Sequence, residues 1–549
     1  MARCAYRGER IREIEENWID NNVKDEKERK RKKEMLSSIL RALGDKADCK
    51  LEAVDGEFCI FHNPEYWRSH EDHVRSEFLK LLQSDGEKYF VGFHLPAIKL
   101  PKVINGDLHM ELTKIHGEFE ASLRFNGMAS FIGATFDEYA LFIGATFNRK
   151  AEFHGAIFNK AAFFINARIN MAHFGEATFN KGAYFDTSVF DKAAFNEATF
   201  NERIWFRETI FNGKTWFEKV IFNGETWFYR AKFNGATYFD EAVFNKGAEF
   251  SRVTFRRDVF FTDLKFEGGS LIIFRSVLFR DPYLVYFDGT DMGRLLLLNT
   301  DIEGISLSNA RLPRGLLRAH ELLRRSNYTG FTFDDVIETY RRLRGNLERN
   351  HRFSDSGILF IGEMEARKER KYYEKLKEHR ERKERIITEQ QKLESKFHKL
   401  MEKGRWHVIS LIERIVFQLE KVGLWLYVNF FSPYALYKHF SKYGESILRP
   451  IAWSIITIFV MPLLFTVLSI FPSAPPGNQP FDASAIFNRL INEYSSNLKL
   501  SILLFFQMAS VDYKTPMSIL ILSILERILG LLFPALEILA LKRMLERHP

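Results

Sequence analysis

Large apolar residues recur in the middle of the chain in steps that place them on no single face of a helix. Between residues 217 and 255, Phe occurs at alternating steps of five and six, and FIGATF at 131–136 returns at 142–147. The repeat is therefore eleven residues long. In a helix turning about 100° per residue, steps of five and six put successive Phe about 140° and about 120° apart, so they lie on no single stripe. Asn-Gly pairs also recur where they would break a helix. Short extended runs with Asn-Gly or Asn-Lys corners fit better, so the pattern predicts a β-solenoid with Phe inside.

The regions around the repeat have other patterns. Residues 1–120 are predicted to form an N-terminal helical and capping region, and the repeats cover 121–312. Residues 313–404 indicate a helical hairpin and then a long charged helix with many i,i+4 pairs. Residues 405–447 are apolar but interrupted by charges, which favours amphipathic interfacial helices over a third span.

The C-terminal region, 448–549, has the pattern of a two-span membrane domain. Residues 448–471 and 517–541 are long and apolar enough to cross a bilayer, whereas the apolar run at 498–508 has the length of a re-entrant or pore helix. Basic residues cluster before the first span and after the second. We therefore expect a multi-pass plasma-membrane protein with both termini and the solenoid in the cytoplasm.

Composition narrows the function classes. The chain has 549 residues, 54 Phe, three Cys and a net charge of +8 spread over mixed-sign stretches. A nucleic-acid partner is therefore not expected, and so few Cys imply no disulfide framework. The N-terminus has no apolar segment typical of a cleaved signal peptide. No nucleophile elbow, phosphate-binding Gly loop or metalloprotease motif occurs, so we expect no enzymatic activity.

The repeats resemble those of pentapeptide-repeat proteins, whose units centre on a large apolar residue with a small one two positions earlier. AKFNG at 231–235 and AVFNK at 242–246 match this unit, with Phe at the centre. The resemblance implies a right-handed quadrilateral β-helix with stacked central residues, in which two eleven-residue units make one coil. DNA mimicry, known among soluble members, requires an acidic surface, whereas charges in these repeats are nearly balanced.

The order of span, polar loop, short apolar helix, polar break, Pro516 and span resembles the two-span, pore-loop ion-channel domain of bacteria and archaea. The resemblance implies four subunits around one pore. Potassium channels carry a Thr-Val-Gly-Tyr-Gly type filter, and its glycines are absent here. The predicted selectivity region consists of Ala509, Ser510, Val511, Asp512 and Tyr513. A ring of Asp512 carboxylates or Ser510 hydroxyls would favour a partly hydrated monovalent or divalent cation. The alternative is a reverse turn between two hairpin helices.

One face of the second span carries polar and helix-bending residues. Glu526, Gly530, Pro534 and Glu537 follow helical spacing and are candidates for pore lining and gating. Alternatively, the charged side chains of Glu526 and Arg527 are paired between helices or snorkel to the membrane surface. Gly530 and Pro534 would then belong to a kinked, tightly packed helix.

Three residues of the N-terminal region suggest a metal site. Cys49, Cys59 and His62 have a spacing compatible with zinc, with His70 or His73 available as a fourth ligand. The alternative is a set of reduced, buried cysteines and no cofactor.

Together these patterns predict an oligomeric, ion-channel-like protein, a homotetramer that is permeable to cations but not potassium-selective. In this prediction the pentapeptide-repeat domain serves sensing, gating or assembly and has an unknown cytoplasmic partner. The alternative is a non-conducting membrane-anchored scaffold whose solenoid binds a cytoplasmic protein.

Overall fold

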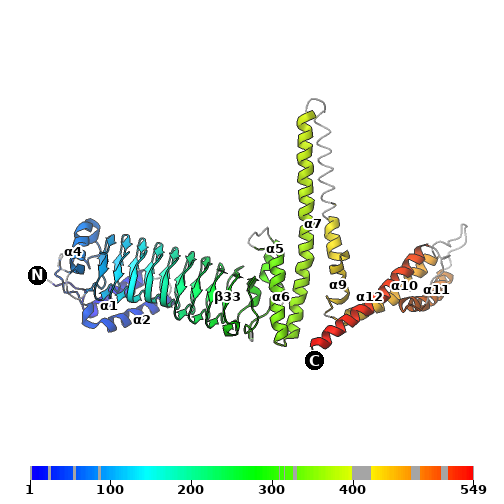
Figure 1. Ribbon diagram of the computed structural model, residues 1–549, viewed down its shortest axis with the longest axis horizontal. Coiled ribbons are helices and arrows are strands. Elements are labelled where there is room, and N and C mark those ends of the chain that lie inside the picture. Colours follow the sequence, from blue (N-terminus) through cyan, green and yellow to red (C-terminus); the bar gives the residue numbers. More distant parts are fainter. Residues whose placement is uncertain are drawn as a thin grey trace. The chain divides into compact units, whose positions relative to one another are not determined.

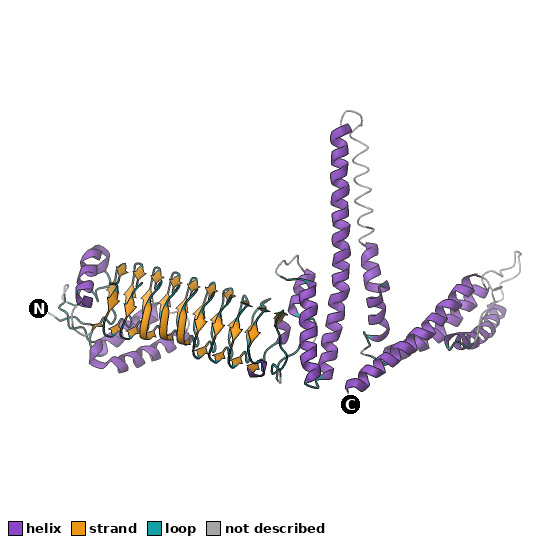
Figure 2. Ribbon diagram, viewed as in Figure 1, coloured by secondary structure: helices purple, strands orange, loops and turns teal. Residues whose placement is uncertain are grey.

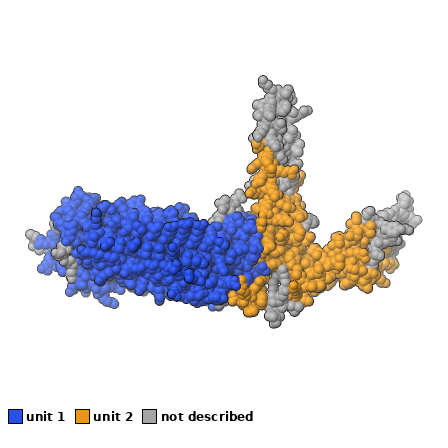
Figure 3. Space-filling view, viewed as in Figure 1, with its two compact units in different colours: residues 1–346 blue, residues 347–549 orange. Residues whose placement is uncertain are grey.

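The computed structural model divides the chain into two compact units, residues 1–346 and 347–549, which are described separately (Figure 3). It describes residues 3–22, 26–53, 57–83, 88–307, 309–313, 316–325, 331–397, 419, 422–444, 446–470, 483–508 and 517–547.

The first unit is dominated by a β-solenoid of short parallel strands, drawn in orange in Figure 2. One sheet contains β2 (His94–Leu95), β6 (Lys114–Ile115), β10 (Thr135–Phe136), β13 (Ile157–Phe158), β16 (Thr178–Phe179), β19 (Thr199–Phe200), β23 (Ile221–Phe222), β27 (Val243–Phe244) and β31 (Lys265–Phe266). A second contains β3 (Ile98–Lys99), β7 (Phe119–Glu120), β11 (Ala140–Leu141), β14 (Ala162–Phe163), β17 (Ala183–Tyr184), β20 (Ile204–Trp205), β24 (Thr226–Trp227), β28 (Ala248–Ser251), β32 (Ile272–Arg275) and β35 (Leu295–Leu298).

The third sheet holds two ladders, which the longer strands β12, β15 and β18 join. Its strands are β1 (Lys88–Tyr89), β4 (Val103–Ile104), β5 (Leu108–His109), β8 (Arg124–Phe125), β9 (Ala129–Ser130), β12 (Thr146–Glu152), β15 (Arg168–His173), β18 (Val189–Ala194), β21 (Ile210–Phe211), β22 (Thr215–Trp216), β25 (Lys232–Phe233), β26 (Thr237–Tyr238), β29 (Thr254–Phe255), β30 (Val259–Phe260), β33 (Leu278–Phe279) and β34 (Val285–Tyr286).

Two eleven-residue units make one coil of the solenoid. Thr135 pairs with Ile157 and Ile157 pairs with Thr178, so successive coils are offset by 22 and then 21 residues. The predicted β-solenoid is therefore confirmed. The right-handed winding of the β-helix and its quadrilateral cross-section stay predictions.

Phe side chains fill the interior in columns that run from coil to coil. Phe153 stacks between Phe131 and Phe174, with ring centroids 5.1 and 4.9 Å apart and nearly parallel planes. Between columns the rings meet edge to face, as Phe142 and Phe153 do at 5.3 Å. The stacking distance matches the strand spacing of about 4.8 Å, so ladder hydrogen bonds and aromatic contacts form in the same register.

The coils begin earlier than the Phe pattern indicates. The ladder starts at β1, so residues 88–120 belong to the solenoid and not only to a cap. In these coils Leu95 and Ile115 occupy fully buried positions that Phe136 fills in the next coil. The repeat was predicted from Phe and therefore starts too late, at residue 121.

Corners of the solenoid follow the repeat as well. Glu176, Glu197 and Lys219 have left-handed backbone conformations, with φ of 59°, 59° and 54°. Asn side chains form a ladder along another corner: Asn223 donates to Asn201 at 2.8 Å, and Asn201 donates to Asn180 at 2.9 Å. These contacts explain why Asn precedes so many of the turns.

Helices cover both ends of the solenoid (Figure 1). At the N-terminal end these are α1 (Glu9–Asn22), α2 (Glu26–Leu43), the short 3₁₀-helix η1 (Gly44–Ala47), α3 (Tyr66–Ser69) and α4 (Glu71–Gln83). Helix α2 lies against one corner, where Met35 contacts Gly155; a Cβ at Gly155 would lie 2.2 Å from the Met35 sulfur. Arg31 of α2 pairs with Glu176 at 2.8 Å.

At the C-terminal end, the last coil meets α6 (Phe333–Arg349), which follows η2 (Pro282–Leu284), η3 (Met292–Arg294) and α5 (Arg318–Arg325). Thr339 accepts a hydrogen bond from the Leu297 N–H of β35 at 3.0 Å, and Asn346 donates to the Ile302 carbonyl at 2.7 Å. The edge strand is thus covered rather than left open to pair with another chain.

The second unit is helical. It contains α7 (Phe353–Phe397), the π-helix η4 (Tyr427–Phe431), α9 (Pro433–Ser441), α10 (Leu448–Ile470), α11 (Ala483–Phe505) and α12 (Met517–Arg547). Among the residues that the structure describes, two segments are long and apolar enough to cross a membrane, Leu448–Leu468 and Ser518–Lys542. The pore helix predicted over 498–508 is instead the C-terminal part of the 23-residue α11. Its polar N-terminal part continues as helix because Tyr494 and Asn497 donate to α10, to the Phe459 carbonyl at 3.1 Å and to Thr466 at 2.9 Å.

Candidate functional site

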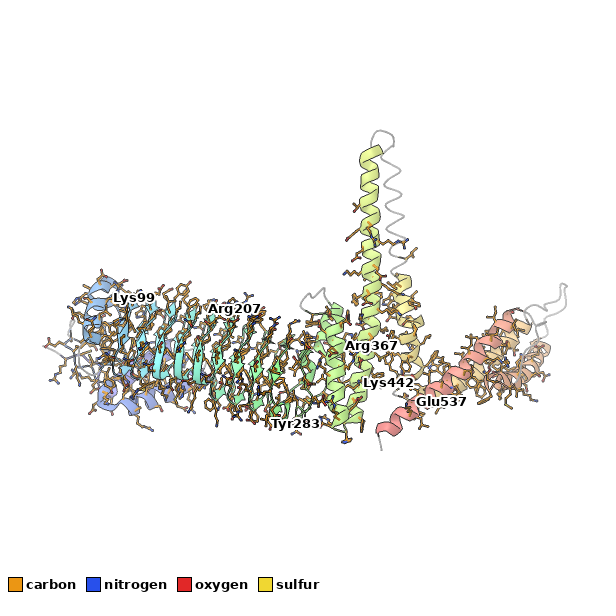
Figure 4. The ribbon with its side chains drawn as sticks, viewed as in Figure 1. Lys99, Arg207, Tyr283, Arg367, Lys442 and Glu537 are labelled. Carbon is orange, nitrogen blue, oxygen red and sulfur yellow. The ribbon has the colours of Figure 1, made fainter. Side chains whose placement is uncertain are left out.

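Helices α10 and α12 lie side by side in opposite directions. Ser454, near the start of α10, donates a hydrogen bond to Glu537, late in α12, at 3.2 Å; Glu537 is labelled in Figure 4. Near the other end, Met461 and Phe465 of α10 form a buried cluster with Leu504 of α11, and Ile519 of α12 packs against it. This order of contacts is that of an antiparallel helix pair.

Helix α11 runs in the same direction as α12 and ends beside its middle. Ser501 donates to Glu526, and the Phe505 carbonyl lies against Gly530, where an added Cβ would be 2.0 Å from the oxygen. Both contacts join residues 25 positions apart, so the two helices are parallel. Gly530 lies near the centre of the apolar segment Ser518–Lys542. The C-terminal end of α11 is therefore level with the middle of the second candidate span.

The polar residues predicted on α12 contact helices of their own chain. Glu526 is 0% exposed and is bonded to Ser501, whose hydroxyl also lies 3.3 Å from the Ile458 carbonyl of α10. Gly530 gives room for the Phe505 carbonyl, and Pro534 lies inside α12 without ending it. The pairing between helices, which was the alternative to pore lining, thus exists for Glu526; pore lining by this face stays a prediction.

Two members of this arrangement were not predicted. Ser501 and Ser454 are small polar residues in apolar runs, and nothing in their local sequence distinguishes them from other serines of these helices. Their partners, Glu526 and Glu537, are 25 and 83 positions away. The predicted selectivity residues 509–513 lie outside the described residues, as does Pro516.

A buried charged cluster connects α7 with α9 and the residues that follow it. Glu365 of α7 accepts hydrogen bonds from Lys438 and Tyr443, both at 2.7 Å, and pairs with Lys368 at 2.9 Å. Burial by itself raises the pKa of Glu365, but the bonds from Lys438 and Lys368 outweigh burial and lower this pKa to about 2. The carboxylate is therefore ionised and holds the start of α7 to the segment that precedes α10.

The N-terminal cap contains a second cluster of functional side chains. Cys4, Cys49, Cys59 and His62 are all buried, with their ligand atoms within 4.8 Å of one another. Hydrogen bonds from the Cys49 and Cys59 thiols lower the pKa of the Cys4 thiol.

The structure brings together the three predicted residues but supplies a different fourth one. His70 and His73, the expected candidates, are exposed on and beside α4, where His70 stacks on Tyr66 at 4.1 Å. Cys4 takes the fourth place instead. It is 45 residues before Cys49, and only the return of the chain through α1 and α2 brings the two together.

Comparison with known families identifies the repeats. A family model described as pentapeptide repeats (9 copies) matches residues 142–189 and 217–265, both within the solenoid. Neither the curated proteins nor the solved structures contain a match to this chain.

Proposed function

We propose, from the premise that this is a pentapeptide-repeat protein with two helices long enough to cross a membrane, that it is an oligomeric, channel-like membrane protein. Its pore passes cations without selecting potassium. The solenoid and both termini lie in the cytoplasm, where the solenoid serves sensing, gating or assembly.

The observation that carries the proposal is the depth at which α11 ends. The Gln507 side chain donates to the Arg527 carbonyl at 2.9 Å, ten residues beyond the start of α12 at Met517. At about 1.5 Å per helical residue, the chain has to return by about 15 Å to enter α12. A helix that lies beside a span and stops at mid-depth has the position expected of a pore helix.

This layout favours several copies over one. Non-helical backbone at membrane depth is tolerated where protein buries it or where it lines a water-filled cavity. The connection between Met508 and Met517 includes Ser510, Asp512 and Lys514, whose polar side chains suit water. A ring of copies around an aqueous axis supplies both the cover and the water, and a pore of two spans per chain requires such a ring.

The exposed surfaces of α10 and α12 are apolar, as expected for helices in a membrane. Large apolar side chains are exposed on both candidate spans, among them Phe459 and Leu463 on α10 and Ile528 and Leu531 on α12. Lipid and neighbouring copies are the two surroundings that accept such surfaces.

The proposal is tested by mass and by ion flux. The full chain, purified in detergent, is expected to have the mass of a tetramer, and after reconstitution into liposomes to pass cations with little preference for potassium. Asp512→Ala should reduce the flux strongly, whereas Glu202→Ala, which removes an exposed carboxylate of the solenoid, should leave it unchanged. A monomeric chain, or equal flux through all three proteins, contradicts the proposal.

A second candidate function is a non-conducting membrane anchor for the solenoid. Ser501 donates to one carboxylate oxygen of Glu526 within the same chain, so this polar contact requires no second copy. On the solenoid, a partly buried outer ladder with centroid distances of 6.2, 5.0 and 4.8 Å is formed by Trp216, Tyr238, Phe260 and Tyr286. Such a surface suits a cytoplasmic protein partner. A monomer without flux, whose partner binding is lost in Tyr238→Ser, is the result expected for this function.

A further inference from the structure

The four clustered side chains of the N-terminal cap come from three separate segments. Cys4 belongs to the arm before α1, Cys49 follows η1, and Cys59 and His62 lie in one turn closed by the bond from the His62 N–H to the Cys59 carbonyl at 3.2 Å. Each of the four is less than a tenth exposed. Three thiols and an imidazole therefore converge in the interior without a disulfide among them.

Three of the distances among the ligand atoms are close to the edges of a tetrahedral metal shell, and all four atoms lie within 4.8 Å of one another. Zinc bonds of about 2.3 Å to sulfur and about 2.0 Å to nitrogen give edges of about 3.8 Å between two sulfurs and about 3.5 Å between sulfur and nitrogen. The Cys49 and Cys59 sulfurs are 3.7 Å apart. His62 Nδ1 lies 3.5 Å from the Cys4 sulfur and 3.2 Å from that of Cys59. A disulfide would need sulfurs about 2.05 Å apart.

The surroundings orient the imidazole as a ligand. His62 Nε2 lies 2.9 Å from the Val91 carbonyl, the acceptor that holds its proton and leaves the Nδ1 lone pair facing the sulfurs. Tyr6 stacks on the ring at 4.0 Å, and Phe93 meets it edge-on at 5.1 Å. The Cys59 N–H also points to the Cys4 sulfur, at 3.4 Å.

Hydrogen bonds alone satisfy this set of groups poorly. The Nδ1 lone pair accepts one proton, yet the thiols of Cys4 and Cys59 both face it. Thiols are weak donors, and the third one, Cys49, contacts the sulfur of Cys59. A cation would instead bind all four ligand atoms at once. A cavity of about 230 Å³ lined by Cys49, His62 and Tyr89 adjoins the cluster and gives an ion access to it.

We propose that Cys4, Cys49, Cys59 and His62 bind one zinc ion, which joins the N-terminal arm to the first coil of the solenoid. A three-cysteine, one-histidine set is a known structural zinc shell, and with all four positions filled by protein the site has no place for a substrate. The link to the solenoid runs through His62 to Val91, which lies between β1 and β2. The ion thus closes the loop that contains α1 and α2 and fixes this cap.

Metal content of the full chain tests the proposal directly. The protein, purified in detergent and dialysed against a weak chelator, should retain one zinc ion per chain. Cobalt exchanged into the site should give the intense visible bands of a tetrahedral ion and a sulfur-to-cobalt charge-transfer band. The three thiols should resist a thiol reagent until a strong chelator removes the ion.

Variants identify the ligands. Cys4→Ser and His62→Ala should lose zinc, and His62→Cys should keep it, because a fourth thiolate completes the same shell. His70→Ala and His73→Ala, which change the histidines nearest in sequence, should bind zinc like the unchanged chain. Since a variant that fails to fold would also lose zinc, the measurements on the unchanged chain are decisive. Wild-type protein with no retained metal and three reactive thiols, or with a Cys49–Cys59 disulfide, overturns the proposal.

Discussion

The solenoid and the α10–α12 bundle are stabilised in opposite ways. In the solenoid, each coil repeats the contacts of its neighbour: Phe206 stacks between Phe185 and Phe228 as Phe217 stacks between Phe195 and Phe239. In the bundle, α11 is held by contacts that occur once, such as the Phe505 carbonyl on Gly530. A repeated contact distributes stability over many positions, whereas a unique contact concentrates it.

The largest effect is expected from a cavity in a Phe column. Phe206 is 0% exposed, with neighbouring ring centroids at 5.0 and 4.9 Å. Phe206→Ala should lower the free energy of unfolding of the solenoid by about 3–5 kcal/mol. Hydrogen exchange of the full chain should show faster amide exchange in residues 185–228, with coils farther away less affected because each coil contacts only its neighbours.

The control for this cavity is an outward-facing aromatic on the adjacent coil. Trp227 is 36% exposed, so Trp227→Ala should change the exchange rates much less. If both variants exchange alike, the Phe columns do not carry the stability of the coils.

The second-largest effect is expected from acid, which should weaken the contacts of Glu365 with Lys438 and Tyr443. The pKa of Glu365 is depressed to about 2 from 4.5, so its contribution is fully present above about pH 4.5 and is lost as the pH falls toward 2. The shift corresponds to at most about 3–4 kcal/mol of unfolding free energy, and to less in practice, because Lys438 is partly exposed and water screens the pair. Chemical unfolding of the second unit at pH 7 and pH 3 measures it.

Glu365→Gln removes the titrating group and keeps its shape. This variant should be less stable than the unchanged chain at pH 7 and should lose most of the stability difference between the two pH values. A difference that stays unchanged in Glu365→Gln assigns the acid sensitivity to other groups.

One substitution, glycine to alanine, should have opposite signs in two helices. In Gly530→Ala, the new Cβ would lie 2.0 Å from the Phe505 carbonyl oxygen, so α11 and α12 must move apart. This should lower the free energy of unfolding by about 1–3 kcal/mol. In Gly345→Ala, on α6, the Cβ meets nothing within 4 Å, and the better helix former should add about 0.5–1 kcal/mol. Thermal unfolding of each variant gives the sign. Destabilisation by both would mean that the close approach at Gly530 is not the cause.

The smallest expected effect concerns the Asn ladder of the solenoid. Asn201→Ala removes the donor to Asn180 and the acceptor for Asn223. The loss of these bonds should lower the free energy of unfolding by about 1 kcal/mol. Arg203→Ala breaks only an exposed pair with Glu225 and should cost less than about 0.5 kcal/mol. Equal midpoints in denaturant for the two variants would show that the ladder adds no more than a surface ion pair.

The site could be predicted only in part, for a physical reason. Glu526 and Gly530 were identified because they interrupt an apolar helix, and such residues need a partner. Which partner they contact depends on how far α11 extends along α12. The apolar composition does not show the length of α11, because its polar residues Tyr494 and Asn497 also belong to the helix and bond to α10. The proposed zinc ligands could also be predicted only in part. Cys59 and His62 are close in sequence and share a turn, whereas Cys4 comes from a distant segment.

By itself, the sequence determined the solenoid, the eleven-residue unit and the two apolar helices. All three are local patterns: a residue's spacing from its near neighbours decides whether it can stack, turn or lie in an apolar layer. Only the tertiary structure decided that coils begin at Lys88, that α11 ends beside Gly530 and that Cys4 joins Cys49, Cys59 and His62. These features depend on segments far apart in the chain meeting in space, and no local period encodes such a meeting.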